Sequence, residues 1–353
     1  MSFKYTSLLP EAISWRDDKL FLLDQTLLPH QERLEEQRSA EDVWQSIQQL
    51  KVRGAPAIGV AAAYGLCVAV RDLVGLALHD FRKSLIAQAD YLESSRPTAV
   101  NLAWALKRML RMADQSGADT AATLYRELVA EAQAIHAEDQ QLCRGMGEHG
   151  APLIKEGMGV LTHCNAGAMA TSGIGTATAP MYVAHSRGVA FRVYADETRP
   201  LLQGARITSW ELQKSGLDVT LNTDNMAAHL MSQGLIDLVI VGTDRVAANG
   251  DVANKIGTLG VAILAKHFGI PFYVACPSST YDPLTASGGD IVIEQRGREE
   301  VVAFAGTPVA PEDIPVCNPA FDVTPNALVA GLITEKGIVR PPFRDGMREM
   351  LGK

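Results

Sequence analysis

The sequence lacks the marks of a membrane, secreted or nucleic-acid-binding protein. None of its 353 residues lie in a run that approaches the roughly twenty uninterrupted apolar residues of a membrane-spanning helix. Residues 1–15 contain no apolar core of the kind found in a signal peptide. Lys and Arg form no cluster, and 32 Lys+Arg against 40 Asp+Glu give a net charge of −8. We therefore expect a cytoplasmic protein that binds neither membranes nor nucleic acid.

Cysteine is scarce and scattered, with no Cys-x-x-Cys spacing among Cys67, Cys143, Cys164, Cys276 and Cys317. An odd and scattered set predicts neither a disulfide framework nor a zinc site, so we expect thiols in a reducing compartment. With 47% hydrophobic and 20% charged residues, the composition is that of a globular protein large enough for two domains.

Two patterns divide the chain. Short alternating runs near the amino terminus predict a small strand-rich segment, and helical patterns follow from Ala40 onward, the last at about 119–148. After Gly150, strands alternate with glycine-bearing loops and helices, which predicts a Rossmann-like, doubly wound parallel sheet. The expected strands are 159–163, 190–195, 218–221, 238–241 and 272–275. We predict an N-terminal strand and helical domain over 1–130 and a sheet domain over 131–353.

Polar residues follow the strand expected at 238–241. The strand itself is an unbroken apolar run, typical of a parallel strand covered on both faces. Ligands of open α/β sheets bind outside the carboxyl ends of the strands, so Asp244 is our first candidate for an acid or base. We interpret the neighbouring Arg245 as structural. Asn249 and Gly250 predict a turn, and we expect Asp251 to cap that turn and a helix after it.

A second polar stretch leaves the first expected strand of the sheet. Cys164 lies where a strand would deliver its last side chain, and a thiol there can serve as an acid, a base or a nucleophile. The alternative, a small buried hydrophobe, stays open. We interpret His163 as a structural histidine bonded to backbone, and Cys276, at the end of another strand, as a buried thiol.

The same stretch contains a Gly-x-Gly at Gly173 and Gly175, with Asp196 about one strand-helix-strand unit later. A dinucleotide fingerprint needs its first glycine directly after the strand and a third glycine where this chain has Thr178. The pattern is therefore weak evidence for a nicotinamide or flavin cofactor.

Several short loops offer donors for an anion. Arg53–Pro56 places a guanidinium and free N–H groups at a helix start, and Arg96 precedes another helix for which Thr98 is a candidate cap. Gln203 lies in the polar loop after the second strand. Each loop alone is typical of ordinary capping and solvation. Together with Lys255 they predict a pocket for one phosphate, with a carboxylate and a thiol for chemistry.

Five motifs occur in order along the chain: RGAPAIGVAAAYG (53–65), SRPTAVNLAWAL (95–106), THCNAGAMATSGIGTA (162–177), DETRPLLQGARITSWEL (196–212) and GTDRVAANGDVANKIGT (242–258). With the tail at 318–325, they closely resemble the methylthioribose-1-phosphate isomerase family of methionine salvage. That family is related to the regulatory subunits of translation initiation factor two B. The resemblance covers nearly the whole chain.

The resemblance implies that the chain converts the aldose 5-methylthioribose 1-phosphate to the ketose 5-methylthioribulose 1-phosphate, without a metal or an organic cofactor. The cysteine of the His-Cys-Asn motif and the aspartate of the Gly-x-Asp-Arg-Val motif, here Cys164 and Asp244, correspond to the family's catalytic pair. The family's substrate contacts correspond to Arg53, Gly54, Ala55, Arg96, Gln203, Asn254 and Lys255. A homodimer formed through the carboxyl-terminal domain is also implied.

The implied chemistry needs an acid. A sugar phosphorylated on its anomeric oxygen opens its ring when the ring oxygen is protonated, and Asp244 is the candidate. Hydrogen then moves from C2 to C1, either as a proton relayed by Cys164 through a phosphorylated enediol or as a hydride. The sequence leaves both routes open. Either route profits from excluding water, so we expect the domain with Arg53 and Arg96 to close with the other over the substrate.

Other functions stay open. A ribose-1,5-bisphosphate isomerase would need a cationic receptor for a second phosphate, where a methylthio group needs an apolar wall. An enzyme that isomerises 5-deoxyribose 1-phosphate is a further alternative. A non-catalytic regulatory subunit would bind a sugar phosphate or a protein without turnover, and the retention of Cys164 and Asp244 argues against it.

Overall fold

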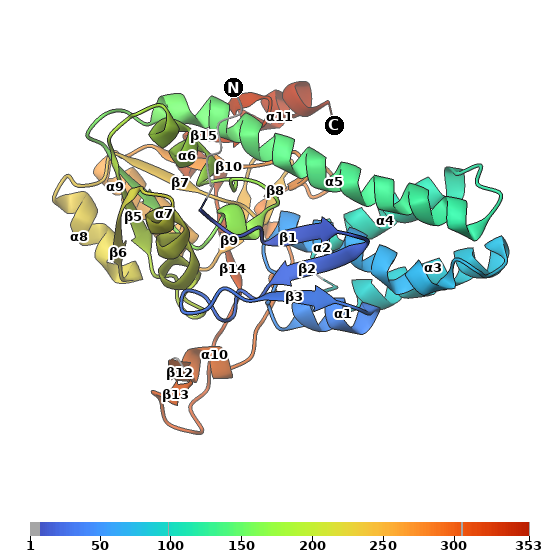
Figure 1. Ribbon diagram of the computed structural model, residues 1–353. Coiled ribbons are helices and arrows are strands. Elements are labelled where there is room, and N and C mark those ends of the chain that lie inside the picture. The colour runs from blue at the N-terminus through green and yellow to red at the C-terminus, as the bar shows by residue number, and fades with distance from the viewer. Residues whose placement is uncertain (1–7, 98, 305, 353) are drawn as a thin grey trace. The chain divides into compact units, whose positions relative to one another are not determined.

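The computed structural model describes residues 8–352 except Thr98 and Ala305, and its contacts divide the chain into two compact units (Figure 1). Unit 1 is made mainly of Arg144–Gly167 and the chain from Thr176 onward, and unit 2 of Leu9–Cys143 and Ala168–Gly175. The long helix α5 therefore contributes residues to both. The division at residue 130 stays a prediction, as does the capping role of Thr98, which lies outside the described residues.

Unit 2 combines a small antiparallel sheet with helices, as the sequence pattern predicts. The sheet has the order β1-β2-β3. Its elements are β1 Ile13–Arg16, β2 Lys19–Leu23, β3 Leu34–Gln37, α1 Ala40–Gln48, α2 Ala55–Val70, η1 Arg71–Leu73, α3 Leu78–Glu93, α4 Val100–Gln115, α5 Ala121–Gly150 and η3 Ala168–Ala170.

Helix α2 is the core of unit 2. It is apolar on all sides and buries most of its residues, the arrangement of a helix surrounded by protein. By length and composition alone, Ala55–Leu73 would also be able to cross a membrane, but most of the stretch is buried inside the protein. Because the core helix of a soluble protein passes the same test, we assign α2 to the core.

Unit 1 is built on a seven-stranded sheet of order β16-β15-β10-β7-β4-β5-β6, parallel except for β16. The five predicted strands are all present; the edge hairpin β15–β16 was not predicted. The bounds are β4 Gly159–Thr162, β5 Arg192–Asp196, β6 Asp218–Asn222, β7 Leu238–Val241, β10 Phe272–Ala275, β15 Gly331–Thr334 and β16 Gly337–Val339.

The strand order reverses direction next to β4. The chain runs from β4 outward through β5 to β6, then returns to β7 on the other side of β4 and continues to β10. Ligands in such sheets bind beyond the carboxyl ends of the two strands that flank this reversal. Right-handed crossovers place the helices after β4 and β5 on one face and the helix after β7 on the other.

A second sheet of unit 1 corrects one prediction. The segment after the Asn249–Asp251 turn is a strand and not a helix, so Asp251 caps no helix there. The strands form a sheet of order β11-β8-β9-β14. Each has four residues or fewer. For β9, pairing with β14, about seventy positions further along the chain, decides the conformation. The strands are β8 Arg245–Ala247, β9 Val252–Lys255, β11 Tyr281–Asp282 and β14 Phe321–Thr324.

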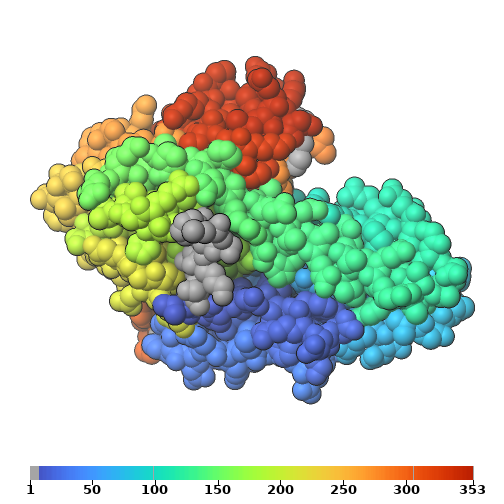
Figure 2. All heavy atoms as spheres, turned by 45° about the horizontal axis from the view of Figure 1, so that its top comes forward, coloured from blue at the N-terminus to red at the C-terminus, as the bar shows by residue number. Residues whose placement is uncertain are grey.

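The remaining elements of unit 1 are helices and one hairpin. The helices are α6 Ala179–Ser186, α7 Ser209–Lys214, α8 Ala227–Ser232, α9 Thr258–Phe268, α10 Glu299–Val302 and α11 Phe343–Leu351, with short turns η2 Ala151–Leu153, η5 Asp224–Met226, η6 Gly288–Asp290 and η7 Asn326–Leu328, and the π-helical turn η4 Gly204–Thr208. The hairpin β12 Ala303–Phe304 and β13 Thr307–Pro308 stands away from the sheet of this unit (Figure 1). The carboxyl-terminal residues gather in one lobe, red in Figure 2, where Phe343, Met347 and Leu351 of α11 join the buried core.

Candidate active site

Cys164 lies two residues beyond β4 with its backbone held on both sides. Its N–H donates to Oγ1 of Thr198 at 2.8 Å, and its carbonyl oxygen accepts from Oγ1 of Thr208 at 2.6 Å. Its φ of 64° is left-handed, which is uncommon for a residue other than glycine. The thiol is half-buried, unlike the buried Cys276. The loops after β4 and β5 together therefore fix the direction of this side chain.

Asp244 lies three residues beyond β7, the other strand at the reversal of strand order. Its N–H donates to the carbonyl oxygen of Ala253 at 3.0 Å, which ties it to β9. The loops that carry Cys164 and Asp244 touch each other, because a Cβ built on Gly242 would lie 2.5 Å from Cβ of Ala166. The structure thus places the predicted catalytic pair in two adjoining loops of unit 1.

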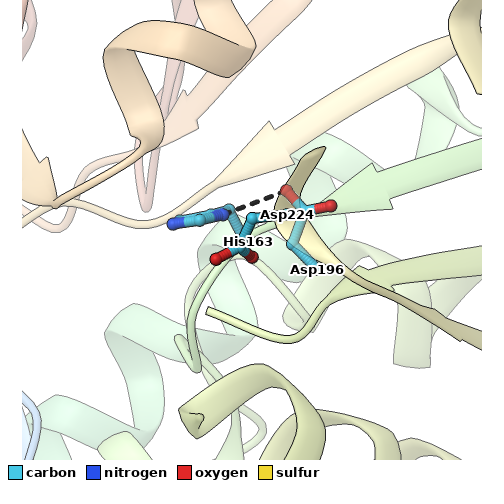
Figure 3. A group of neighbouring side chains, drawn as sticks. All are labelled: His163, Asp196 and Asp224. Atoms are coloured by element: carbon cyan, nitrogen blue, oxygen red, sulfur yellow. Dashed lines mark hydrogen bonds and ion pairs between the residues drawn. The ribbon is translucent and has the colours of Figure 1, made fainter. Parts of the chain in front are cut away.

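His163, just before Cys164, is buried and hydrogen-bonded at both ring nitrogens, and Figure 3 shows the bond to Asp196. Nε2 lies 2.9 Å from the backbone oxygen of Ile256, as the structural interpretation predicts, and Nδ1 lies 3.0 Å from Oδ2 of Asp196. Burial lowers the pKa of His163, but the hydrogen bond and charge of Asp196, with smaller contributions from Asp224, raise it above its usual value.

His163, Asp196 and Asp224 place one possible ligand atom each within 4.8 Å of one another, a spacing that a metal ion would fit (Figure 3). Their atoms are already used. Both oxygens of Asp224 accept backbone N–H groups, from Thr198 and Arg199 at 2.7 Å each. Oδ1 of Asp196 accepts from Asn222 at 2.7 Å, and Oδ2 faces His163. These donors favour an ordered polar network over a cation site.

Three predicted substrate contacts also lie in unit 1. Gln203 is buried, and its Oε1 has no hydrogen-bond partner among the described residues. Buried acceptors are seldom left unpaired, so this oxygen is suited to receive a hydroxyl or N–H from a ligand. Asn254 is buried in β9 and donates to Oγ1 of Thr258 at 3.0 Å. Lys255 is half-buried, with its ammonium 4.8 Å from the ring centroid of Phe321.

The other predicted contacts, Arg53, Gly54, Ala55 and Arg96, belong to unit 2. Gly54 is the N-cap of α2 with φ of 93°, so this segment begins a helix, as the sequence predicts. Nε of the buried Arg53 donates to Oε1 of Gln25 at 3.3 Å, and the Gln25 amide donates to the carbonyl oxygen of Met169 at 2.8 Å. Arg96 is half-buried between α3 and α4.

One structural interpretation holds, and one cofactor pattern loses its basis. Arg245 pairs with Asp282 at 3.7 Å, in keeping with a structural role. The Gly173–Gly175 pattern lies in the segment assigned to unit 2, and the next helix, α6, begins only at Ala179. Asp196, the acid that a dinucleotide fingerprint would supply, is fully buried and bonded to His163.

Sequence reasoning missed the residues that hold Cys164 in place. Thr198 and Thr208 support its backbone, and Thr198 Oγ1 in turn donates to the Asp196 carbonyl oxygen at 3.0 Å. One signal in the sequence is that Asp196 and Thr198 fall in a polar loop after a strand. Gly204 gives a second signal, because a Cβ there would lie 1.6 Å from the Asp196 carbonyl oxygen.

Residues 51–341 match the Initiation factor 2 subunit family. A Bacillus cereus protein named 5-deoxyribose 1-phosphate isomerase is 54% identical over 338 residues, which are 96% of this chain and 97% of that protein. The crystal structure of 5-methylthioribose 1-phosphate isomerase from Pyrococcus horikoshii OT3 is 41% identical, covering 100% of this chain and 98% of the other with a TM-score of 0.94. The structure of translation initiation factor eIF-2B, subunit delta, from A. fulgidus is 42% identical, covering 98% and 100% with a TM-score of 0.89. These matches confirm the predicted α/β architecture.

Proposed function

The chain belongs to the initiation factor 2 subunit family, in which it is a sugar-phosphate isomerase, and we propose that it converts 5-methylthioribose 1-phosphate to 5-methylthioribulose 1-phosphate. The observation that carries the proposal is the position of Cys164 and Asp244. They follow two adjacent parallel strands where the strand order reverses, in loops that touch each other. A thiol and a carboxyl group there can exchange protons with one small substrate.

In the proposed reaction, Asp244 donates a proton to the ring oxygen, and the bond between that oxygen and C1 breaks. Hydrogen at C2 then moves to C1 while the hydroxyl at C2 loses its proton and becomes the ketone. In the hydride route Cys164, as a thiolate, takes up the hydroxyl proton. In the enediol route Cys164 carries the proton from C2 to C1, and the Asp244 carboxylate takes up the hydroxyl proton. Substrate and product are isomers, so neither route consumes a reductant, an oxidant or water.

We infer that the remaining predicted contacts bind the substrate. The unpaired Oε1 of Gln203 is an acceptor for a sugar hydroxyl. Lys255 and Arg53 are cations suited to the phosphate, and the start of α2 at Gly54 and Ala55 adds N–H donors. We assign Arg96 to the phosphate and Asn254 to positioning of the sugar. A homodimer and a cytoplasmic location stay predictions.

A second substrate is 5-deoxyribose 1-phosphate. Relatives with that substrate in their name are up to 54% identical to this chain over nearly their whole length. Both sugars are apolar at C5, which bears a methylthio group in one and is itself a methyl group in the other, so one apolar wall accommodates either. A ribose 1,5-bisphosphate would place a second phosphate against that wall, and we expect it to be turned over poorly or not at all.

The test is an NMR assay of the purified, metal-stripped protein with each of the three sugar phosphates in deuterated water. We expect ketose from the methylthio sugar and from the 5-deoxy sugar. Asp244→Asn and Cys164→Ser should each abolish turnover while the protein stays folded. Deuterium at C1 of the product would support the enediol route, and protium at C1 would support hydride transfer or a shielded proton.

Two matched controls separate the chemistry from general effects of substitution. Cys317→Ser changes an exposed thiol, and Asp218→Asn changes an exposed carboxylate, so both should keep full activity. A folded wild-type protein that makes no ketose from any of the three sugars would overturn the proposal. Binding of a sugar phosphate without turnover would then favour the regulatory function.

A further inference from the structure

The ring of His163 faces a hydrogen-bond acceptor at each nitrogen. A backbone carbonyl oxygen only accepts, so Nε2, 2.9 Å from the oxygen of Ile256, must carry a hydrogen. Nδ1 and Oδ2 of Asp196, 3.0 Å apart, then share one further proton. That proton makes either an imidazolium beside a carboxylate or a neutral imidazole beside a carboxyl group. In both forms the pair is neutral overall, as two buried ionisable groups need to be.

The surroundings of the pair hold the shared proton tightly. The hydrogen bond and charge of Asp196, with a smaller contribution from Asp224, raise the pKa of His163 although burial opposes this. Burial also raises the pKa of Asp196, to which Asp224 contributes, while the hydrogen bonds with His163 and Asn222 lower it. Because the pKa of each partner lies above its usual value, the pair keeps its one proton near neutral pH.

The backbone of Gly257 packs tightly against the ring of His163. Gly257 has φ of 104°, and a Cβ there would lie 2.8 Å from Cε1 and 2.9 Å from Nε2 of His163. The N–H of Gly257 donates to Asp322 at 2.7 Å, which fixes the segment against the ring. The fit leaves no space for a side chain at residue 257.

Three loops with predicted site residues meet at this pair. Cys164 directly follows His163 in the loop after β4. Lys255 directly precedes Ile256, whose oxygen receives the hydrogen bond from Nε2. Gln203 directly precedes Gly204, which lies against the carbonyl oxygen of Asp196. His163 therefore precedes Cys164 directly and is bonded to the residue after Lys255, and Asp196 contacts the residue after Gln203.

We propose that His163 and Asp196 are a positioning pair for the isomerase, which hold one proton between them and lock the loops of Cys164, Gln203 and Lys255 in register. The proposal rests on the proposed function of these residues. Charge-assisted hydrogen bonds are stronger than neutral ones, so the pair fixes the loops more firmly than two neutral side chains would. Neither side chain is required to touch the substrate.

Asp196→Asn tests the proposal, because it keeps the shape and every hydrogen bond but removes the shared proton. The new amide can accept from Asn222 and donate to Nδ1, with the ring neutral and Nε2 still bonded to Ile256. We expect kcat to fall by about 10- to 100-fold, as for small misplacements of a catalytic group, with a smaller change in KM. His163→Gln, which retains only one of the two bonds, should lower kcat further.

The pH profile separates positioning from mere stability. In the wild type, an extra proton must go onto the Asp196 carboxylate, whereas in Asp196→Asn it goes onto a neutral imidazole, whose ordinary pKa is about 2.5 higher. We expect the acid limb of the kcat profile to move toward neutral pH by about one unit or more. Asp218→Asn is the matched control. Asp218 is a carboxylate at the start of β6 that is bonded to Arg192 at the start of β5, whereas Asp196 lies at the other end of β5.

NMR of the wild-type protein labelled with ¹⁵N-histidine tests the shared proton without any variant. We expect the ring nitrogens of His163 not to titrate between about pH 6 and 8, because the pair keeps its shared proton over that range. A ring that titrates in that range would overturn the proposal, as would Asp196→Asn with unchanged kcat and acid limb. An inactive wild-type protein would overturn the proposed function and the positioning role with it, whereas an active wild type with an unchanged variant would overturn only the latter.

Discussion

Cys164 and Thr198, from the loops after two adjacent strands, both have a left-handed backbone and are joined by a hydrogen bond. Their φ values are 64° and 67°, and the N–H of Cys164 lies 2.8 Å from the Thr198 hydroxyl. A positive φ is a true outlier for a β-branched residue such as Thr198, and such conformations persist only where the surroundings enforce them. The N–H groups of Thr198 and Arg199 supply that enforcement, since both donate to Asp224.

We predict that Thr198→Val leaves the buried N–H of Cys164 without an acceptor. The loss of that bond should lower the free energy of unfolding by about 1–3 kcal/mol, and turnover should fall because the thiol is less well held. Thr198→Ser keeps the hydroxyl and is the matched control. Chemical denaturation and the ketose assay measure the two effects; equal values for the two variants would show that the hydroxyl does not hold Cys164.

Gly54→Ala should damage unit 2 at the start of α2. The residue has φ of 93°, and a Cβ there would lie 2.6 Å from Cβ of Ala170. The strained backbone and the clash together should cost about 1–3 kcal/mol of unfolding free energy. Gly260→Ala is the control, because residue 260 lies in helix α9 with open space around it, and alanine there should stabilise by up to about 1 kcal/mol. Denaturant unfolding of both variants decides the matter.

Asp139 should make stability depend on pH. It is buried in α5 and accepts from the N–H of Ser172 at 2.6 Å, and burial raises its pKa to about 6. A carboxyl group with a raised pKa in the folded state binds its proton more tightly there than in the unfolded chain. Its contribution to stability is therefore present below about pH 4 and is lost as pH rises to about 6, by at most about 3 kcal/mol.

Asp139→Asn removes that titration. We expect the difference in unfolding free energy between variant and wild type to change in the variant's favour as pH rises from about 4 to 6, and then to stay constant. Denaturant titrations at several pH values measure it. A difference that does not vary with pH would mean that Asp139 is not protonated preferentially in the folded protein.

Asp251→Ala should destabilise unit 1, although Asp251 caps no helix. Its Oδ1 accepts from the backbone N–H and the amide of Asn326, both at 2.8 Å, and its Oδ2 accepts from Asn249 at 2.8 Å and Gly288 at 3.0 Å. Burial opposes its charge, but these bonds leave its pKa below the usual value. The stabilisation is thus present above about pH 4 and is lost as pH falls through the folded pKa.

The expected loss for Asp251→Ala at neutral pH is about 1–3 kcal/mol, because several N–H groups lose their acceptor. Asp313→Ala, at an exposed position, is the control and should change stability by less than about 0.5 kcal/mol. Thermal unfolding at neutral and acid pH compares the two. If Asp251→Ala matched its control, the four hydrogen bonds would contribute nothing measurable.

The main strands of the parallel sheet could be predicted from local sequence. The apolar run at Leu238–Val241 gives strand β7 with the predicted bounds. The positions of Cys164 and Asp244 beyond strand ends also followed from the sequence, because apolar periodicity and glycine-bearing loops act over a few neighbouring residues. The roles of Cys164, Asp244 and the substrate contacts stay proposals.

The partners of His163 were decided by tertiary structure alone. Asp196 is 33 positions away and Ile256 is 93 positions away. The pairing of β4 with β5 and the position of β9 in the second sheet bring both residues next to the ring of His163. The strand at Val252–Lys255 has the same origin, since its partner β14 lies about seventy residues further along. A hydrogen bond between distant residues leaves no periodic trace in either segment, so local patterns identify the loops but not the contacts between them.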